Sequence, residues 1–363
     1  MELMTASRQW ASRPSDERFV SLLDMQQHFD HIRENSRQVV VSSRRIQAAP
    51  TEDNKGLMVT GPNGHAYGVT HWAFGQLGQL AEAPAGYLRT LPAPIAADCI
   101  NYGLQFKRDI EEVGVLLYKN GGDPLLRAAT GPNYGRIWNS DITRGLVNRF
   151  GDGLSGDFRV PGEFGKAVEI TKDNTTLYAG DRDMFVFLAD ESHRIEIPNR
   201  RDGQPGQMAR GFFVWNSEVG SATFGLATFL FDYVCCNRIV WGAQEYKEIT
   251  LRHTSGAPDC YTEQMAPALE RYANGSSATV VKAIEDARAH RLGDQEAVDK
   301  FLLGRFTKRQ AEKIKTAHMA DENRPIETLW DASVGVTAYA RTIPHQDARV
   351  ALERDAGHII DMA

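Results

Sequence analysis

The sequence predicts an α+β fold in which a mixed or largely antiparallel sheet is covered by helices and followed by a helical C-terminal region. Short segments rich in β-branched and aromatic residues recur from about residue 37 to residue 255, most of them bounded by Gly or Pro. Apolar residues at helical spacing occur at 15–35, 70–82 and 136–149. Beyond residue 262 the patterns are mostly helical, so a helical region is expected to follow the sheet.

Size and composition indicate a globular protein. The chain has 363 residues, of which 42% are hydrophobic and 24% charged, enough for two domains or for one large domain with an extension. No apolar run reaches the roughly 18 residues of a membrane span without a charge. The N-terminus also lacks the basic-then-apolar order of a signal peptide, so a cytoplasmic protein is expected. The formal charge of −6 argues against a uniformly basic surface but is compatible with a local basic patch.

In chain order, residues 1–14 are predicted to be a polar N-terminal arm and residues 15–255 the α+β core. Ser15 is expected to cap the first helix, because its hydroxyl can accept a hydrogen bond from the first turn. A single strand is predicted over 37–50, where β-branched residues alternate with polar ones and Pro50 ends the run.

The next segments are predicted to be helical. A second helix is expected over 70–82, with Thr70 as its N-cap. A third, short helix is expected to be broken by Pro92 and Pro94, because proline lacks the N–H that a helix interior needs.

The middle of the chain contains the candidate boundary and the candidate core. Glycine is frequent at 151–165, so a long loop and a possible boundary within the core are expected there. The polar, Gly-rich segment 199–211 is interpreted as an exposed loop between strands. It leads into 210–242, the densest apolar and aromatic run, which is expected to form the centre of the molecule. Residues 262–363 are the predicted helical region, with Pro344 between its last two helices.

Common motifs for cofactor sites are missing from the sequence. The four cysteines lack metal-ligand spacing, and the Gly-rich segments lack the Gly-Lys-Ser/Thr ending of a phosphate-binding loop. His28 and His31 lie three residues apart on the first helix without an evident third ligand. The leading interpretation therefore includes no metal and no cofactor.

Several phrases of the sequence resemble one family. They are ASRQWASRPSDERFVSL, YGVTHWAFGQLGQLAEAPAGYLRTLP, FVWNSEVGSATFGLATFLFDYVCCNRIVWG with the following LRHTSG, and VTAYARTIPHQDARVALERDAG. In this order they span most of residues 5–358 and resemble a phage- and plasmid-borne family of unknown function, carried by prophages, plasmids and integrative elements. The resemblance implies a mobile-element protein and suggests DNA handling, including single-strand annealing. It implies no catalytic residues.

Local basic clusters agree with a role in DNA binding. They lie at the end of the first predicted strand, in and beside the 199–211 loop, and along the predicted helix 300–318. Their cations would neutralise phosphates, and Tyr134, Trp138 and Phe306 are candidates for stacking on bases. The candidate nucleic-acid-binding residues are Arg44, Arg45, Arg200, Arg201, Arg210, Arg305, Lys308, Arg309, Lys313 and Lys315. The alternative for each cluster is an ordinary solvated charged surface.

A second interpretation is a metal-dependent nuclease or another phosphoryl-transfer enzyme. Asp181 and Asp183 alternate along a predicted strand, so both carboxylates would lie on one face and could share Mg²⁺ or Mn²⁺ with Glu218. The structural alternative is that Asp-x-Asp ends a strand and that Glu218 caps a turn or pairs with Arg210.

The leading prediction is a non-enzymatic DNA-handling protein of a mobile element. It would bind single-stranded DNA, with annealing as a further activity, and act as a homo-oligomer. A third interpretation is a protein-interaction factor, such as an inhibitor of host defence, with a host or phage protein as its partner.

Overall fold

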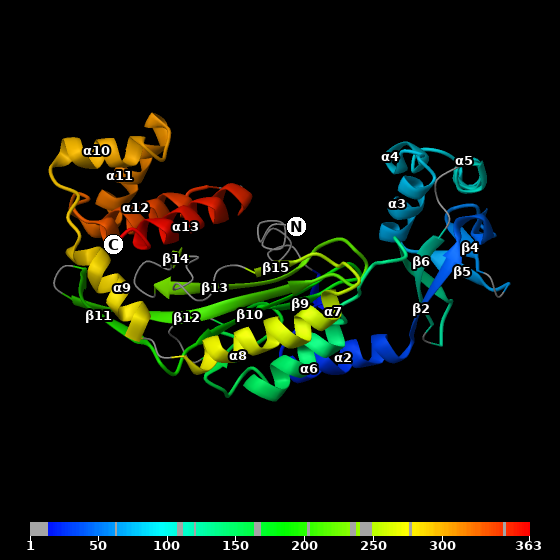
Figure 1. Ribbon diagram of the computed structural model, residues 1–363, viewed down its shortest axis with the longest axis horizontal. Coiled ribbons are helices and arrows are strands. Elements are labelled where there is room, and N and C mark those ends of the chain that lie inside the picture. The colour runs from blue at the N-terminus through cyan, green and yellow to red at the C-terminus, as the bar shows by residue number, and fades with distance from the viewer. Residues whose placement is uncertain are drawn as a thin grey trace.

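The computed structural model describes residues 14–363 apart from 62–63, 107–111, 120, 163–167, 202–203, 233–236, 240–248, 276–277 and 344–345. For 199–201, 204, 231–232, 237–239 and 346–350 only the backbone is described. Residues 1–13 of the predicted arm, the Cys235–Cys236 pair and Pro344 therefore lie outside the described residues. Two sheets organise the described chain, and helices cover both (Figure 1). The predicted α+β class is confirmed.

The larger sheet is antiparallel throughout and forms the central unit. Its main strand order is β1-β9-β10-β12-β13-β14, while β8 pairs with β10, β11 with β12 and β15 with β13. The strands are β1 (Arg18–Phe19), β8 (Phe158–Arg159), β9 (Leu177–Ala179), β10 (Met184–Asp190), β11 (Ile195–Arg201), β12 (Gln204–Asn216), β13 (Phe224–Asp232), β14 (Asn237–Ile239) and β15 (Ile249–Leu251). Helices α2 (Leu22–Glu34), α6 (Asn139–Phe150) and α8 (Ala266–Asn274) cover one face (Figure 1).

The predicted apolar centre is confirmed for its described part. β12 and β13 are the longest strands of the sheet and pair from Met208↔Asp232 to Trp215↔Gly225. Because side chains alternate along a strand, Phe212 and Val214 pack against α2 and α6, while Phe213 joins Phe187 and Phe229 on the other face. The stretch is thus scaffold, buried on both faces.

The smaller sheet belongs to a separate unit, formed by the part of the chain that follows α2 and precedes α6. Its order is β2-β6-β7-β5-β4-β3, antiparallel except for β5 and β7. Its elements are β2 (Ser36–Ser42), the 3-10 turn η2 (Ser43–Arg45), β3 (Gln47–Pro50), β4 (Leu57–Thr60), β5 (Ala66–Val69), α3 (His71–Leu80), α4 (Ala85–Leu88), α5 (Ala93–Phe106), β6 (Glu112–Tyr118) and β7 (Leu125–Thr130). The loop at 151–165 does not divide the two units, because β8 within it pairs with β10 of the central sheet.

Four sequence expectations need correction. The first helix begins at Leu22 and Ser21 caps it, because Ser15–Glu17 form the 3-10 turn η1 and β1 then pairs with β9. The single strand expected over 37–50 is β2 and β3 with η2 between them.

The third correction concerns the segment 199–211, where the described residues belong to strands and not to a loop: 199–201 end β11 and 204–211 begin β12, which pairs with β11. Likewise, α5 is one continuous helix. Pro94 lies in its first turn, where the missing N–H costs no hydrogen bond.

The helical C-terminal region is confirmed. It contains α7 (Ala257–Cys260), the π-helical turn η3 (Tyr261–Met265), α8, α9 (Ala278–Ala289), α10 (Gln295–Leu303), α11 (Lys308–Glu322), α12 (Leu329–Arg341) and α13 (Gln346–Ile360). The residues of α12 from Leu329 to Ala340 are all buried, so this helix is the centre of a second core. Within the described residues, no helix is long and apolar enough to cross a membrane.

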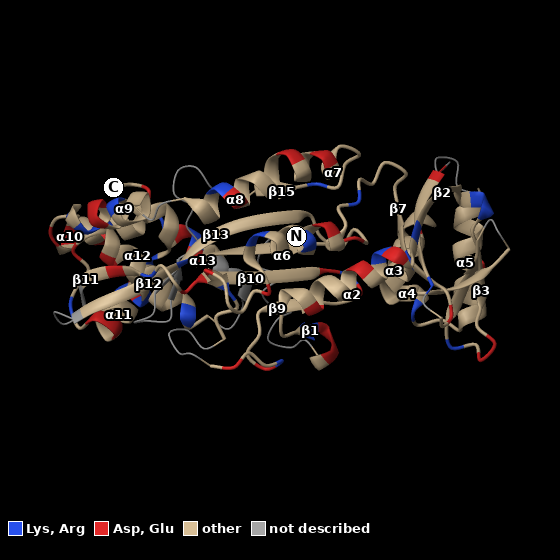
Figure 2. Ribbon diagram, turned by 90° about the horizontal axis from the view of Figure 1, so that it is seen from below, with Lys and Arg blue, Asp and Glu red and all other residues tan. Residues whose placement is uncertain are grey.

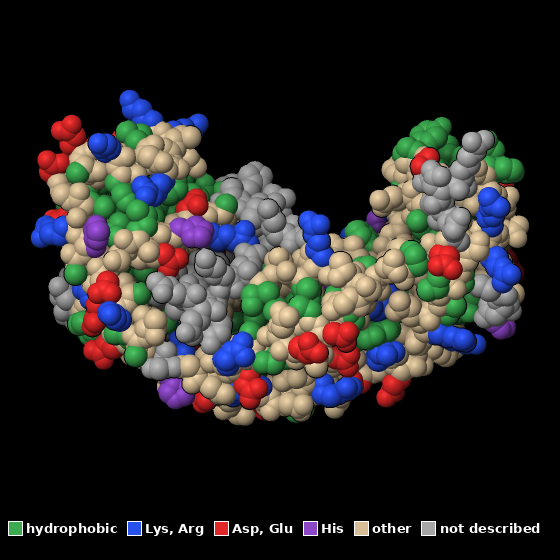
Figure 3. All heavy atoms as spheres, in the orientation of Figure 1, with side chains coloured by type: hydrophobic (Ala, Val, Ile, Leu, Met, Phe, Trp, Pro, Cys, Tyr) green, Lys and Arg blue, Asp and Glu red, His purple; other side chains and the backbone are tan. Residues whose placement is uncertain are grey.

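The small unit and the C-terminal helices rise at opposite ends of the central sheet (Figure 1). In the space-filling view the face between them is hollowed (Figure 3). Helix α3 lies on the side of the small unit that faces this hollow, whereas α2, α6 and α8 lie on the opposite side of the central sheet (Figure 1).

A cross-strand glycine leaves room for an aromatic ring in the central sheet. Gly225 is paired with Trp215, and a Cβ atom at Gly225 would lie 1.8 Å from the Trp215 ring. We therefore expect Gly225→Ala to lower the free energy of unfolding by about 1–3 kcal/mol, the usual cost of overpacking a core. Urea denaturation measures this, with Gly131→Ala as the control, because a Cβ atom at Gly131 has no heavy atom within 4 Å. An equal loss in both variants would contradict the packing argument.

Candidate nucleic-acid interface at the junction of the two sheets

The two units meet at the turn between β12 and β13, residues 216–221. The small unit donates two hydrogen bonds to this turn: Trp72 Nε1 and Gln76 Nε2 bond to the carbonyl oxygen of Val219 at 2.9 and 2.8 Å. The hydroxyl of Tyr134, on the connection to α6, donates to the carbonyl oxygen of Ser217 at 2.8 Å. The turn is therefore held by groups from both units.

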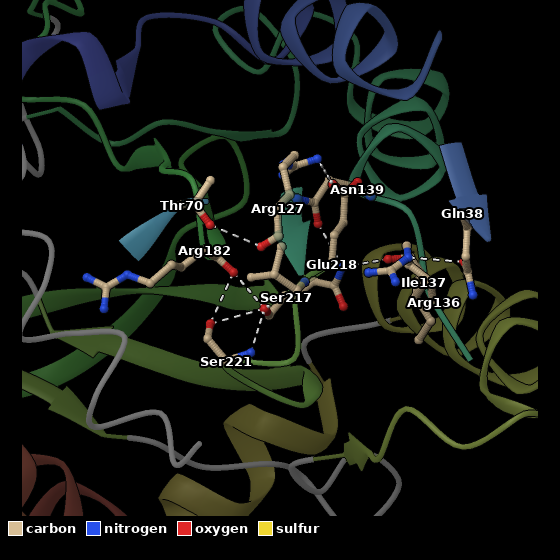
Figure 4. Close-up of polar contacts among 12 residues, drawn as sticks. Gln38, Thr70, Arg127, Arg136, Ile137, Asn139, Arg182, Ser217, Glu218 and Ser221 are labelled. Atoms are coloured by element: carbon tan, nitrogen blue, oxygen red, sulfur yellow. Dashed lines mark hydrogen bonds and ion pairs between the residues drawn. The ribbon is translucent and has the colours of Figure 1, made fainter. Parts of the chain in front are cut away.

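Glu218 carries the charge at the centre of this junction (Figure 4). Its side chain is 1% exposed, and Oε2 accepts from Nη1 of Arg127 on β7 at 3.1 Å. Oε1 accepts from the backbone N–H of Asn139, the first residue of α6, at 2.9 Å. A carboxylate at a helix N-terminus is also favoured by the helix dipole. Both carboxylate oxygens thus have structural partners, and the pair joins the small sheet to the central one.

A ladder of rings and cations lines the connection from β7 to α6. Tyr134, Arg136 and Trp138 alternate along it, and the Arg136 guanidinium lies 5.1 Å from the Tyr134 ring and 5.7 Å from the Trp138 ring. Arg33 lies 3.8 Å from the Trp138 ring, and His253 stacks on Tyr134 at 4.8 Å. Burial lowers the pKa of Arg136 to about 10, so it stays charged at neutral pH. The predicted base-stacking rings Tyr134 and Trp138 are thus already in contact with side chains of the protein.

A pocket of about 300 Å³ lies beside this junction, between α3 and the β9–β10 turn. It is lined by His71, Trp72, Gly75, Gln76, Gln79, Arg89 and Arg182. The lining contains two arginines and no carboxylate, which is the pattern that suits an anionic ligand.

Both arginines of the pocket are held by a hydrogen bond to the protein and have exposed side chains. Arg89 donates from Nη2 to the carbonyl oxygen of His71 at 3.0 Å and is exposed. The carbonyl oxygen of Arg182 accepts from the hydroxyls of Ser217 and Ser221 at 2.6 and 3.0 Å. Its side chain is 44% exposed and points away from that network (Figure 4), with Nε 3.7 Å from Asp181 Oδ1.

The structure does not bring the predicted basic residues together. Arg44 and Arg45 are exposed on η2 in the small unit, whereas the predicted cations from Arg305 to Lys315 lie in the C-terminal region at the other end. Basic and acidic residues are interspersed along the described chain (Figure 2). For Arg200 and Arg201 the side chains are not described.

Several of these cations have partners within the protein. Arg305 donates to the carbonyl oxygen of Phe301 at 3.1 Å, and the ammonium of Lys313 lies 5.6 Å from the Tyr339 ring. Arg210 is 5% exposed and pairs with Asp190 at 3.2 Å, while its Nη1 donates to the carbonyl oxygen of Gly275 at 2.7 Å. Arg210 therefore has little surface to offer a phosphate. Lys315 Nζ lies 2.8 Å from Asp299 and 2.9 Å from Glu312. The third proposed stacking ring, Phe306, is buried.

The three acids of the nuclease interpretation have different environments. The side chain of Asp181 is 58% exposed, whereas Asp183 is buried. The carboxylate oxygens of Glu218 accept hydrogen bonds from Arg127 and from the backbone N–H of Asn139. Among the residues that the structure describes, no group of three or more His, Cys, Asp and Glu side chains could hold a metal ion.

A second cavity, of about 490 Å³, contains the two helix histidines. His28 and His31 line it together with acidic residues of η1 and the β9–β10 turn and with Arg127. Burial, and then the charge of Arg127, lowers the pKa of His28. The neutral form of His28 is therefore favoured. Asp181 lines this cavity, whereas the next residue, Arg182, lines the pocket beside α3.

The pocket residues Arg89 and Arg182 are not among the candidate residues that the sequence indicates. Arg182 lies between Asp181 and Asp183, the two aspartates of the nuclease interpretation. No local pattern joins α3 to the β9–β10 turn, since only the tertiary contact at the 216–221 turn places them together. From the sequence, Arg89 and Arg182 can be recognised only as basic residues and not as members of one site.

The buried pair of Arg127 and Glu218 gives a prediction on stability. Glu218→Ala leaves the Arg127 guanidinium buried without its carboxylate, so the free energy of unfolding should fall by about 3–5 kcal/mol. The matched control is Glu327→Ala, which breaks the exposed pair of Arg291 and Glu327 and should cost less than about 1 kcal/mol. Urea denaturation of both variants checks this, and similar losses in the two would contradict a central role for Glu218.

The environment of His253 gives a prediction on pH dependence. Burial lowers the pKa of His253 to about 4 from its ordinary value of 6.5. Between these two values the unfolded chain binds a proton that the folded chain does not, so stability falls as the pH falls from 6.5 to 4. We expect His253→Gln, which keeps a donor for the carbonyl oxygen of Gly135, to reduce this loss by about 1–3 kcal/mol. Denaturation at several pH values measures the difference, and parallel stability profiles would refute it.

Comparison with protein-family models, with curated proteins and with solved structures gives no match. The function therefore has to be argued from the site itself.

Proposed function

We propose that this chain binds single-stranded DNA along its hollowed face, with Arg89 and Arg182 holding phosphates at the junction pocket. The observation that carries the proposal is the pocket itself: two exposed arginines and no carboxylate line it, in a chain whose formal charge is −6. A local cationic surface on an acidic protein concentrates polyanion binding at one place.

The chemistry of the pocket suits a nucleic-acid strand. Guanidinium groups recognise phosphate through parallel N–H donors, and each of these two arginines keeps donors that the protein does not use. Trp72 and His71 place rings beside the arginines, and an unpaired base offers a flat face to such rings. A duplex hides those faces, so the pocket favours a single strand.

The resemblance to the phage- and plasmid-borne family supports a role in a mobile element. Under this proposal the protein is a non-enzymatic, cytoplasmic DNA-handling protein that anneals strands as a homo-oligomer. Arg44 and Arg45 at one end, and the candidate cations from Arg305 to Lys315 at the other, are proposed as secondary contacts. No specific observation favours the nuclease interpretation, because both carboxylate oxygens of Glu218 already bond to Arg127 and Asn139.

Fluorescence anisotropy with a labelled single-stranded oligonucleotide tests the proposal. We expect Arg89→Ala and Arg182→Ala each to weaken binding several-fold and to reduce the slope of log K against log salt by about 1, as the loss of one phosphate contact does. Arg182→Lys should keep most of the slope, because it keeps the charge. The titration is repeated at two or more salt concentrations.

The matched control is Arg144→Ala on α6, which removes the same charge from an exposed position on the opposite side of the central sheet. It should leave affinity and salt slope nearly unchanged. Absence of binding at micromolar protein in low salt would refute the proposal and leave the interpretation as a protein-interaction factor. Equal losses in all three alanine variants would place the DNA elsewhere.

A further inference from the structure

Helix α5 exposes an apolar seam on the outside of the small unit. Ile95, Tyr102 and Phe106 are 49%, 69% and 67% exposed, and the half-buried Cys99 lies between them in sequence. The rings of Tyr102 and Phe106 contact each other at 5.0 Å. Tyr87 on α4 is also 63% exposed. Figure 3 shows hydrophobic side chains at the surface in the region of α4 and α5.

The spacing of the seam is that of a helix–helix contact. Positions 95, 99, 102 and 106 are separated by four, three and four residues, the a/d spacing of a coiled coil. A seam confined to a and d positions is narrower than the face with which a helix covers its own core.

The other face of α5 already has its core contacts. Ala96, Ile100 and Leu104 are buried in the core of the small unit. A Cβ atom at Gly103 would lie 2.1 Å from the carbonyl oxygen of Ala81, so the helix is closely docked at the end of α3. The seam is therefore held in a fixed orientation, and the described residues of this chain leave it uncovered.

We propose that a second copy of this chain covers the seam, with α5 packing antiparallel against α5 of the other copy around a twofold axis. In this arrangement Ile95 faces Phe106 of the second copy, and Cys99 faces its Tyr102. A small or aliphatic side chain then meets an aromatic ring in every layer, which fills space evenly. The seam is thus complementary to itself, as a twofold interface requires.

The polar edge of the seam agrees with this pairing. Asp98 and Gln105 are exposed along the same edge of α5. In the antiparallel arrangement Asp98 of one copy lies opposite Gln105 of the other, where an amide donor meets a carboxylate. In a parallel arrangement this edge of one copy would lie next to the opposite edge of the other, so Asp98 would not meet Gln105.

The size of the seam predicts a weak dimer. Aromatic side chains bury about 150–250 Å² each when fully covered, and the seam supplies two from each copy. The sum stays below the roughly 1,200 Å² of a standard stable interface. Association should therefore depend on protein concentration in the micromolar range.

Sedimentation velocity from low to high micromolar concentration tests the interface. We expect the average mass of the unmodified chain to rise towards that of a dimer, and Tyr102→Glu to remain a monomer, because its carboxylate would be buried in the seam. Leu303→Glu on α10, at a position that is 52% exposed, is the matched control and should dimerise like the unmodified chain. Circular dichroism melting verifies that each variant is folded.

Two outcomes would overturn the proposal. A chain that stays monomeric at every concentration has no such interface, and the seam then belongs to a different partner. A Tyr102→Glu variant that dimerises normally has its interface elsewhere.

A mixing experiment tests the antiparallel direction. Ile95→Lys and Phe106→Glu should each be monomeric alone. Mixed together they should form a heterodimer, because the introduced ammonium then faces the introduced carboxylate while the remaining Ile95–Phe106 layer is intact. A parallel pair would gain no such contact, so a mixture that remains monomeric would overturn the antiparallel arrangement.

Discussion

The orientation of the small unit on the central sheet depends on one buried ion pair. Glu218 and Arg127 have little access to water, so their attraction is set against the cost of taking both charges out of it. The net energy of such a pair is modest, but an alternative docking that kept these groups buried without pairing them would leave an uncompensated buried charge. The pair therefore selects one docking geometry, and Asn139 ties the same carboxylate to the start of α6. Hydrogen bonds from Trp72 and Gln76 to the next residue, Val219, reinforce that geometry.

The candidate DNA pocket exists only because of this docking. One wall comes from α3, where Trp72 and Gln76 donate hydrogen bonds to the 216–221 turn. The other wall comes from Arg182, whose carbonyl oxygen accepts hydrogen bonds from two hydroxyls of the same turn. A single turn thus sets the separation of the two walls. Loss of the junction would separate Arg89 from Arg182 even if both units stayed folded, so the DNA-binding proposal implies that binding depends on Glu218.

The sequence predicted elements well where the signal was local. Thr70 caps α3, as expected, because its hydroxyl accepts from the N–H of Ala73 three residues on. Ser15 failed as a cap because β1 pairs with β9, a contact far along the chain that no local pattern reveals. Glu218 was a candidate metal ligand in the nuclease interpretation, with a turn cap or a pair with Arg210 as the structural alternative. Its actual partner, Arg127, lies on the other sheet, where no local pattern points to it. The pocket residues were missed for the same reason.

The small unit links the two proposals physically. Helix α3 provides one wall of the pocket, and α5 docks against the end of α3 while its seam residues Ile95, Tyr102 and Phe106 are exposed. Pairing through α5 would therefore hold two pockets at a fixed separation, one in each copy. Annealing needs two strands close together with their bases unpaired, and a weak dimer supplies this when each copy carries a strand. DNA that spans both pockets would in turn strengthen the dimer, because the second contact is then intramolecular.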